Sequence, residues 1–315
     1  MPHTPQSKNA WPFSAPRRRT LACLAGSALL AAGTPSWSQT APAARPKPTR
    51  PEPQPRLVTV GGGITEVVYT LGAQAMLVGT DTTSLYPEAA QNTPKVGYMR
   101  QLSAEGLLSL RPDALVSSTD AGPPVVIDQI RSAGVTVELI ESDHSWDEVR
   151  RKVAAVGRAT SRQTEARALQ DRLDARWTAM QTQVRQAARR KTPRVLFVLS
   201  HTGTALVAGQ ATAADAMLRF AGLANALSDF KGYRPMTAEA MAAAAPDLLL
   251  MTTQGLEAVG GRDKLWQRPE LALTPAFRRR HSARTLLAFD ALALLGFGPR
   301  MPEMIEALHQ QVFGA

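Results

Sequence analysis

Twelve residues of this chain recur 134 positions further along: residues 102–113 read LSAEGLLSLRPD, and residues 236–247 read MTAEAMAAAAPD. Both copies place Ser or Thr two positions before a glutamate and then run through apolar residues to Pro-Asp. Each copy continues into a pattern typical of a buried strand. A repeat of this length indicates one supersecondary unit that the chain uses twice. We therefore expect two similar halves, and a protein with two like lobes usually holds its ligand between them.

A second, looser repeat supports the same duplication. Residues 65–72 and 214–222 each read as a helix that ends at a glycine near the start of its half. Strand-like apolar runs occur in both halves, at residues 57–60, 75–79, 114–118 and 135–140 and at residues 195–200, 205–208, 248–253 and 285–289. Helical or loop segments separate these runs, which predicts an α/β fold with two Rossmann-like lobes, each built on a parallel sheet with crossover helices.

One long helix is predicted between the two halves. Residues 161–190 contain neither Gly nor Pro, and apolar residues recur every three or four positions. These residues are Ala166, Leu169, Leu173, Trp177, Met180, Val184 and Ala187. Such a helix would be roughly 40 Å long. We place the first lobe at residues 57–160, the connecting helix at 161–191 and the second lobe at 192–315, with a ligand cleft between the lobes. Because a helical connection resists bending, we expect lobe closure to be small.

Residues 1–38 read as a signal peptide, which predicts export of the chain. Its features are Arg17, Arg18 and Arg19, an apolar run at 21–32 that is too short to span a bilayer, and a small-x-small cleavage site at Ser36-Trp37-Ser38. The general export route and a twin-arginine route both stay open. Six prolines make residues 39–56 a stiff linker. Cys23, the only cysteine, lies within the leader, so the mature chain is expected to lack disulfides and thiolate sites.

The net charge of +10 belongs mostly to the leader and the linker. Residues 57–315 contain 28 basic and 25 acidic residues and no patch that combines basic with aromatic side chains, so we expect no nucleic-acid partner. The sequence also lacks the Gly-x-Ser-x-Gly, His-Glu-x-x-His and phosphate-binding Gly-Lys-Ser/Thr motifs. We therefore expect a binding protein rather than an enzyme.

Several separated blocks resemble one family. Residues 61–72 resemble the first helix of periplasmic binding proteins for haem and siderophores. Residues 96–106, 198–201, 208–217, 233–235 and 293–298 resemble the haem-binding branch, so the resemblance covers about residues 56–315. It implies a monomeric periplasmic protein that binds haem between its lobes and delivers it to the dimeric permease of an ABC importer, with its ATPase, at the inner membrane. A ferric siderophore or corrinoid carrier is the closest alternative, and a secreted haem-modifying enzyme is a more distant one.

Tyr98 is the first candidate ligand of haem iron. A phenolate oxygen suits the hard ferric ion, and Tyr is one of the known axial ligands of haem. A phenol must lose its proton to bind iron, which a nearby cation favours, and Arg100 stands two residues further on. The resemblance implies that Tyr98 is the axial ligand and that Arg234, from the other lobe, is its hydrogen-bonding partner. The alternative is a tyrosine whose ring packs in a loop.

His201 is the second candidate. It follows the strand-like run 195–200, and loops after the strands of a parallel sheet face the binding crevice. A neutral imidazole can ligate haem iron. Carriers of this kind can take two stacked haems, one on a tyrosine and one on a histidine at this position, so the resemblance implies one or two haems. The alternative is a histidine that hydrogen-bonds within its loop or contacts a propionate.

Other side chains are candidates for holding the haem. Arg100, Arg234 and Lys95 could bind propionates, since a guanidinium binds a carboxylate with two hydrogen bonds. Met99 and Met236 could pack on the porphyrin face. The alternatives are ordinary surface charge for the cations and core packing for the methionines.

Glu105 and Glu239 occupy matching positions in the two copies of the repeat. Each is expected near the start of a helix, where the helix dipole favours a carboxylate, so helix capping is one reading of both. The resemblance assigns them another role, in which matched glutamates on the two lobes meet arginines on the two permease subunits. Opposite charges a lobe apart would set the docking register.

Overall fold

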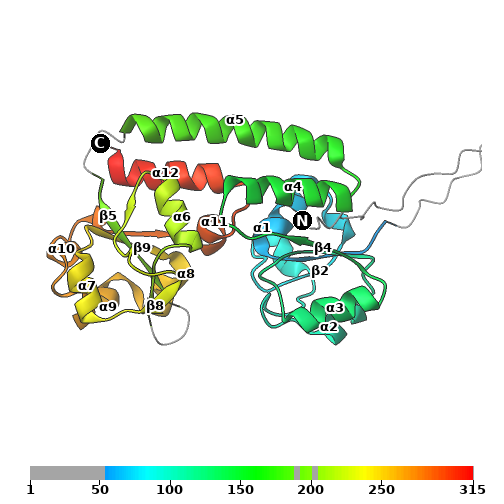
Figure 1. Ribbon diagram of the computed structural model, residues 1–315, viewed down its shortest axis with the longest axis horizontal. Coiled ribbons are helices and arrows are strands. Elements are labelled where there is room, and N and C mark those ends of the chain that lie inside the picture. The colour runs from blue at the N-terminus through cyan, green and yellow to red at the C-terminus, as the bar shows by residue number, and fades with distance from the viewer. Residues whose placement is uncertain (1–53, 188–191, 201–204, 315) are drawn as a thin grey trace, which may run out of the picture. The chain divides into compact units, whose positions relative to one another are not determined.

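The computed structural model of the protein describes residues 54–187, 192–200 and 205–314. The expected signal peptide, most of the linker and His201 lie outside these residues. Figure 1 shows two α/β lobes, each with its own sheet, and the long helix α5 (Gln163–Ala187) running along both. Among the helices of the described ranges, none is both long enough and apolar enough to cross a membrane.

The first lobe is built on a four-stranded sheet in the order β2-β1-β3-β4, and every neighbouring pair is parallel. Its strands are β1 (Leu57–Val60), β2 (Leu77–Thr80), β3 (Ala114–Ser118) and β4 (Thr136–Ile140). Its helices are α1 (Gly62–Thr70), α2 (Ala104–Ser109), α3 (Pro124–Ser132) and α4 (Trp146–Ala159), with short 3₁₀ turns at Gln74–Met76 and Glu88–Asn92. All of β1 and β3 is buried, as expected for central strands of a parallel sheet. The predicted parallel sheet is confirmed for this lobe.

The second lobe carries a six-stranded sheet in the order β10-β9-β5-β6-β8, with β7 also paired to β5. Its strands are β5 (Arg194–Leu199), β6 (Leu206–Ala208), β7 (Ala224–Asn225), β8 (Tyr233–Pro235), β9 (Leu248–Thr252) and β10 (Leu286–Phe289). Its helices are α6 (Ala213–Phe220), α7 (Ala238–Ala244), α8 (Thr253–Ala258), α9 (Gly261–Trp266), α10 (Pro275–Arg278), α11 (Ala291–Leu295) and α12 (Met301–Phe313), with 3₁₀ turns at Pro269–Leu271 and Ala283–Thr285.

This second sheet is mixed, which corrects the expectation of a parallel sheet in each lobe. Strand β6 is antiparallel to β5, and β8 is antiparallel to β6, whereas β5, β7, β9 and β10 pair in parallel. The cause is the length of the connection. Only residues 200–205 separate β5 from β6, and a parallel neighbour would need a crossover of about a dozen residues or more.

The repeated twelve residues form the same unit in both lobes, α2 followed by β3 and α7 followed by β9. Ser103 caps α2 by accepting a hydrogen bond from the Gly106 amide at 3.3 Å. Thr237 caps α7 by accepting one from the Ala240 amide at 3.2 Å. The hydroxyl residue of each copy therefore starts its helix, as N-cap residues do.

The closing Pro-Asp of each copy also has one structural role. Asp113 accepts a hydrogen bond from the Arg56 backbone N–H at 2.7 Å, and its own N–H donates to the Arg56 carbonyl at 2.8 Å. Asp247 makes the same two contacts with Arg194, at 3.0 and 2.8 Å. Arg56 precedes β1 and Arg194 begins β5, so each aspartate fixes the entry into the first strand of its lobe.

Helix α5 packs along both lobes through the apolar face that the sequence predicts. Ala166, Leu169, Leu173, Met180 and Val184 are all buried. On the same helix, the Trp177 ring stacks on Trp146 of α4 at 4.6 Å and meets Phe220 of α6 edge-on at 5.0 Å. The predicted connecting helix is confirmed, and aromatic contacts attach it to a helix of each lobe.

The lobes also touch each other directly. Glu66 of α1 is buried and accepts hydrogen bonds from Arg300 Nε and Nη2 at 2.9 and 3.0 Å. The buried Lys152 ammonium of α4 donates to the carbonyls of Gly296 and Phe297 at 2.9 and 3.1 Å. A side chain added at Gly63 would collide with the Gly296 carbonyl oxygen. These contacts join the two lobes closely at the side covered by α4 and α12.

Candidate ligand-binding site

Tyr98 lies at an exposed turn on the segment between β2 and α2. Its side chain is 41% exposed, and its carbonyl accepts a hydrogen bond from the Gln101 amide at 2.8 Å, which closes the turn. The preceding residue, Gly97, has φ of 102°, a conformation that side chains rarely adopt. The glycine therefore allows the backbone to present the phenol outward.

A single arginine holds the Tyr98 hydroxyl. Arg100 Nη1 donates to Tyr98 Oη at 3.0 Å, and Arg100 Nη2 forms an ion pair with Asp120 at 3.4 Å. This finding corrects the expectation that Arg234 would be the hydrogen-bonding partner. The Arg234 guanidinium instead lies over the Phe230 ring, 4.4 Å from its centroid. Arg100 therefore takes the place expected for Arg234 of the opposite lobe, because the turn at Tyr98 brings residues 98 and 100 together.

Tyr233 is a site residue that the sequence reasoning missed. It lies on β8, the edge strand of the second sheet, and is 38% exposed. Desolvation raises the pKa of the Tyr233 phenol, while a hydrogen bond with Thr212 and the positive charge of Arg100 act in the opposite direction. The sequence signal was the Tyr-Arg-Pro block at 233–235, of which only the arginine was considered.

Lys95 does not fit the predicted role of propionate partner. Its ammonium donates to Thr80 Oγ1, the Ser84 carbonyl and the Ala90 carbonyl at 2.9, 3.0 and 2.9 Å. An ammonium has three donors, so none is left for a carboxylate. Desolvation lowers the pKa of Lys95. The side chain fixes the loop after β2 and so supports the Tyr98 turn from behind.

The two candidate methionines pack into the lobes rather than outward. Met236 is buried in the core of the second lobe with Leu196 and Met251, where its side chain serves core packing. Met99 is partly buried and packs against the core of the first lobe. The core packing of Met236 agrees with the alternative role for the two methionines, whereas the partly buried Met99 stays a candidate for packing on a ligand.

Glu105 and Glu239 occupy the second position of α2 and α7, and both side chains are exposed. The hydroxyl oxygens of Ser103 and Thr237 already accept the N-cap hydrogen bonds, so the glutamate carboxylates are not needed as caps. Within the described part of the chain, neither glutamate forms a hydrogen bond or an ion pair with another side chain. The two lobes therefore present one free carboxylate each, on matched helices.

Comparison with known proteins agrees with this architecture. A model of the periplasmic binding protein family matches residues 57–285. The chain belongs to the periplasmic binding protein family. The expected class of fold and the expectation of binding rather than catalysis are confirmed by this membership, since the relatives are substrate-binding proteins.

Three similar proteins show how far the likeness extends. A solved structure described as the periplasmic heme-binding protein BhuT in complex with two hemes is 47% identical, covering 82% of this chain and 97% of that one, with a TM-score of 0.77. The ABC transporter substrate-binding lipoprotein YvrC of Bacillus subtilis is 27% identical over 205 residues, 64% of this chain and 65% of that protein. A cobalamin-binding protein of Halobacterium salinarum is 28% identical over 63% of this chain and 54% of its own length. The matches thus span between about half and two thirds of these two curated relatives.

Proposed function

We propose that this protein binds ferric haem between its lobes, with Tyr98 as an iron ligand, and delivers it to the permease of an ABC importer from the periplasm. The observation that carries the proposal is the exposed Tyr98 phenol with the Arg100 guanidinium on its oxygen at 3.0 Å. The 47% identity to a protein solved with two haems supports the choice of ligand. Export through the leader at residues 1–38 belongs to the same proposal.

The chemistry of this site suits ferric haem. A phenolate oxygen is a hard ligand for Fe³⁺, and a guanidinium on that oxygen stabilises its negative charge. The Arg234 side chain makes no hydrogen bond within the described residues, so its donors are available to a propionate. Tyr233 offers an exposed aromatic ring from the opposite lobe. The two lobes therefore supply an iron ligand, an aromatic surface and cations.

Haemin titration tests the proposal that Tyr98 is an iron ligand. Replacing Tyr98 with Ala should remove most of the haem absorbance change, including the tyrosinate-to-iron charge-transfer band, at stoichiometric haemin. Tyr69→Phe, on the half-buried outer part of α1, is the matched control and should titrate like the unchanged protein. An unaltered spectrum for Tyr98→Ala would remove the assignment.

The number of haems depends on His201, which lies outside the described residues. We propose a second haem with His201 as its ligand, which the two haems of the similar protein support. Haemin titration of His201→Ala should then reach its endpoint at one equivalent where the unchanged protein reaches it at two. Equal endpoints would show that His201 holds no haem of its own.

Glu105 and Glu239 are proposed as the docking residues for the two permease subunits. Each is exposed, forms no ion pair within the described residues and occupies the same helix position of its lobe. Reversing both charges with Glu105→Lys and Glu239→Lys should leave haem binding intact and reduce haem uptake in cells. Uptake that persists at the normal level would argue against docking by these residues.

The 28% identity to a cobalamin-binding protein makes a corrinoid the second candidate ligand. A corrinoid carrier would need no bond from Tyr98 to iron. Competition separates the two ligands: excess cyanocobalamin should not displace bound haemin if the site is built for haem. Displacement at similar concentrations would favour the corrinoid.

A further inference from the structure

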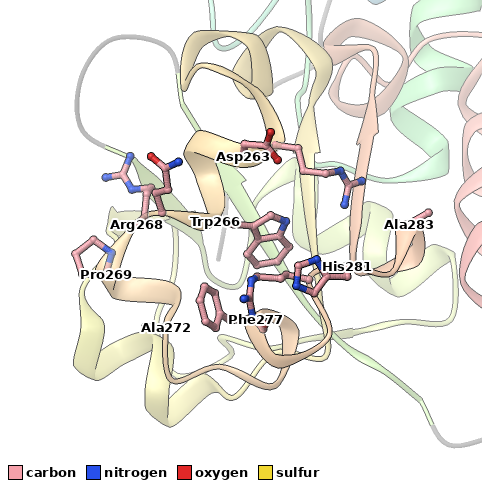
Figure 2. A pocket seen from close by; sticks show the side chains of 11 residues that line it. Asp263, Trp266, Arg268, Pro269, Ala272, Phe277, His281 and Ala283 are labelled. Carbon is pink, nitrogen blue, oxygen red and sulfur yellow. Dashed lines mark hydrogen bonds between the residues drawn. The ribbon is translucent and has the colours of Figure 1, made fainter.

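A hollow of about 910 Å³ opens on the second lobe. It is formed by α9, the 3₁₀ turn at Pro269–Leu271, α10 and the segment that follows α10. Figure 2 shows Trp266 at its centre, with Phe277 and His281 beside it. Neither Tyr98 nor Tyr233 lines this hollow. Its size lies in the range of small-molecule sites, about 300–1,000 Å³.

The floor of the hollow is aromatic. Trp266 is only 8% exposed, and its ring meets Phe277 edge-on with the centroids 6.3 Å apart. The indole nitrogen of Trp266 is buried and has no hydrogen-bond partner among the described residues. A buried indole N–H ordinarily finds an acceptor, because leaving it unpaired costs free energy. The floor therefore offers a flat apolar surface, and the buried indole nitrogen lies out of reach of a ligand in the hollow.

The rim of the hollow is mainly cationic. The Arg280 guanidinium lies 4.3 Å above the Phe277 ring and uses Nη1 on the Phe277 carbonyl at 3.2 Å. Arg262 uses Nη2 on the Leu286 carbonyl at 2.9 Å. The remaining donors of both side chains make no hydrogen bond within the ranges that the structure describes. One backbone contact each thus holds these two arginines at the rim and leaves the rest of each guanidinium available.

Two further charges line the hollow. Arg268 forms an ion pair with Glu270 at 3.4 Å, yet its Nε is buried without a partner. Asp263 is the one carboxylate among the described residues of the lining and is exposed. The surplus of positive charge and the available donors of Arg262 and Arg280 select an anion, and the aromatic floor selects a flat apolar body.

From this combination, we infer that the hollow binds an organic anion with a flat aromatic body and a carboxylate, at a site separate from the haem site. The carboxylate lies against Arg262 and Arg280, and the aromatic body lies on Trp266 and Phe277. The basic linker at residues 39–56 has the wrong charge to occupy the hollow itself.

The indole N–H signal of Trp266 in a ¹H–¹⁵N spectrum reports directly on this site, and Trp266→Phe identifies it. Naphthalene-2-carboxylate should move that signal saturably, whereas the neutral 2-naphthylmethanol should not. The Trp146 indole, which already donates to Asp174 at 2.6 Å, should stay in place. No saturable movement, or equal movement with the neutral alcohol, would overturn the inference.

Variants test the role assigned to the rim. Arg280→Gln should weaken binding of naphthalene-2-carboxylate about tenfold or more, because a charge-assisted contact is lost. Arg278→Gln is the matched control: it is an exposed arginine two residues away that does not line the hollow. Its effect should stay within about twofold, as for an exposed charge. An equal loss in both variants would mean that general basic charge, and not this site, attracts the probe.

The same measurement in Tyr98→Ala separates this site from the haem site. Binding of naphthalene-2-carboxylate should be unchanged in that variant, and its loss would show that the probe reads the haem site instead. Haemin added to Tyr98→Ala/His201→Ala distinguishes the sources of the anion. Broadening of the Trp266 signal by the ferric ion would identify a porphyrin carboxylate as a ligand, and a response to naphthalene-2-carboxylate alone would identify a smaller aromatic acid.

Discussion

Arg100 serves two partners, since one terminal nitrogen donates to Tyr98 Oη at 3.0 Å and the other pairs with Asp120 at 3.4 Å. A hydrogen bond to a charged group contributes about 1.5–3 kcal/mol. We therefore expect Arg100→Ala to weaken haemin binding about tenfold or more, as followed by absorbance titration. Asp120→Asn should have a smaller effect, because an exposed ion pair contributes about 0–1 kcal/mol.

Arg131→Ala is the control for this prediction. Arg131 is also exposed and also forms an ion pair, with Asp128 at 3.2 Å, but it lies on α3 and touches no candidate ligand. If Arg131→Ala weakened binding as much as Arg100→Ala, the hydrogen bond to Tyr98 would not be the cause.

At the scale of single residues, the sequence indicated which residues to consider better than it indicated the contacts that each of them makes. Tyr98, Glu105 and Glu239 could be singled out because each lies in a local motif. The roles of Lys95, Met236 and Arg234 could not be predicted, because they depend on which carbonyls, core residues and rings lie nearby after folding. Lys95 finds three oxygens on its own loop, and Arg234 finds the Phe230 ring.

At the scale of elements, substitutions in α2 and α7 distinguish residues that cap a helix from residues that are proposed to dock. Ser103→Ala and Thr237→Ala should each lower the free energy of unfolding by about 1 kcal/mol, because each removes the acceptor for a helix N–H. Glu105→Gln and Glu239→Gln should change it by less than about 0.5 kcal/mol, because these exposed side chains form no hydrogen bond or ion pair within the described residues. Urea unfolding measures both.

Within each helix, the alanine variant of the cap residue is the control for the glutamine variant of the glutamate. A cost for the glutamine variants equal to that of the alanine variants would make the glutamates structural and would remove the reason for assigning them to docking.

The repeat predicted these elements well because each copy carries its own start and end signals. The hydroxyl residue caps the helix, the apolar run buries it, and Pro-Asp leads into the strand at both positions. The antiparallel pairing of β6 and β8 was not predicted, because a strand's apolar pattern does not state its direction. The length of the connection at residues 200–205 was the available signal.

At the scale of the whole molecule, buried charges join the lobes. Glu66 pairs with Arg300, and Lys152 reaches from α4 to the carbonyls of Gly296 and Phe297. Burial raises the pKa of Glu66 and lowers the pKa of Lys152, so desolvation outweighs the attraction to their partners. Such contacts are better suited to fixing the orientation of the lobes than to adding net stability. Together with α5, they support the expectation that lobe closure is small.

Substitution of Lys152 tests these contacts between the lobes most directly. Lys152→Met leaves the Glu148 carboxylate, which accepts from the ammonium at 2.6 Å, buried without its cation. We expect a loss of about 3–5 kcal/mol in the free energy of unfolding, because Glu148 and the carbonyls of Gly296 and Phe297 lose their buried hydrogen-bond donor. Lys152→Met/Glu148→Gln should recover part of it, because the uncompensated charge is gone. Lys264→Met, at an exposed lysine of α9, should be nearly neutral.

The difference in free energy of unfolding between the unchanged protein and Lys152→Met should depend on pH with a definite sign. Because burial lowers the pKa of Lys152 below its usual 10.5, the folded protein releases this proton at a lower pH than the unfolded chain does. Between the lowered pKa and 10.5, the unfolded chain binds more protons, so stability from this group rises with pH. Urea unfolding of the unchanged protein and of Lys152→Met across alkaline pH should therefore show a difference that grows as pH rises. A difference that shrinks would mean that attraction to Glu148, and not burial, controls this lysine.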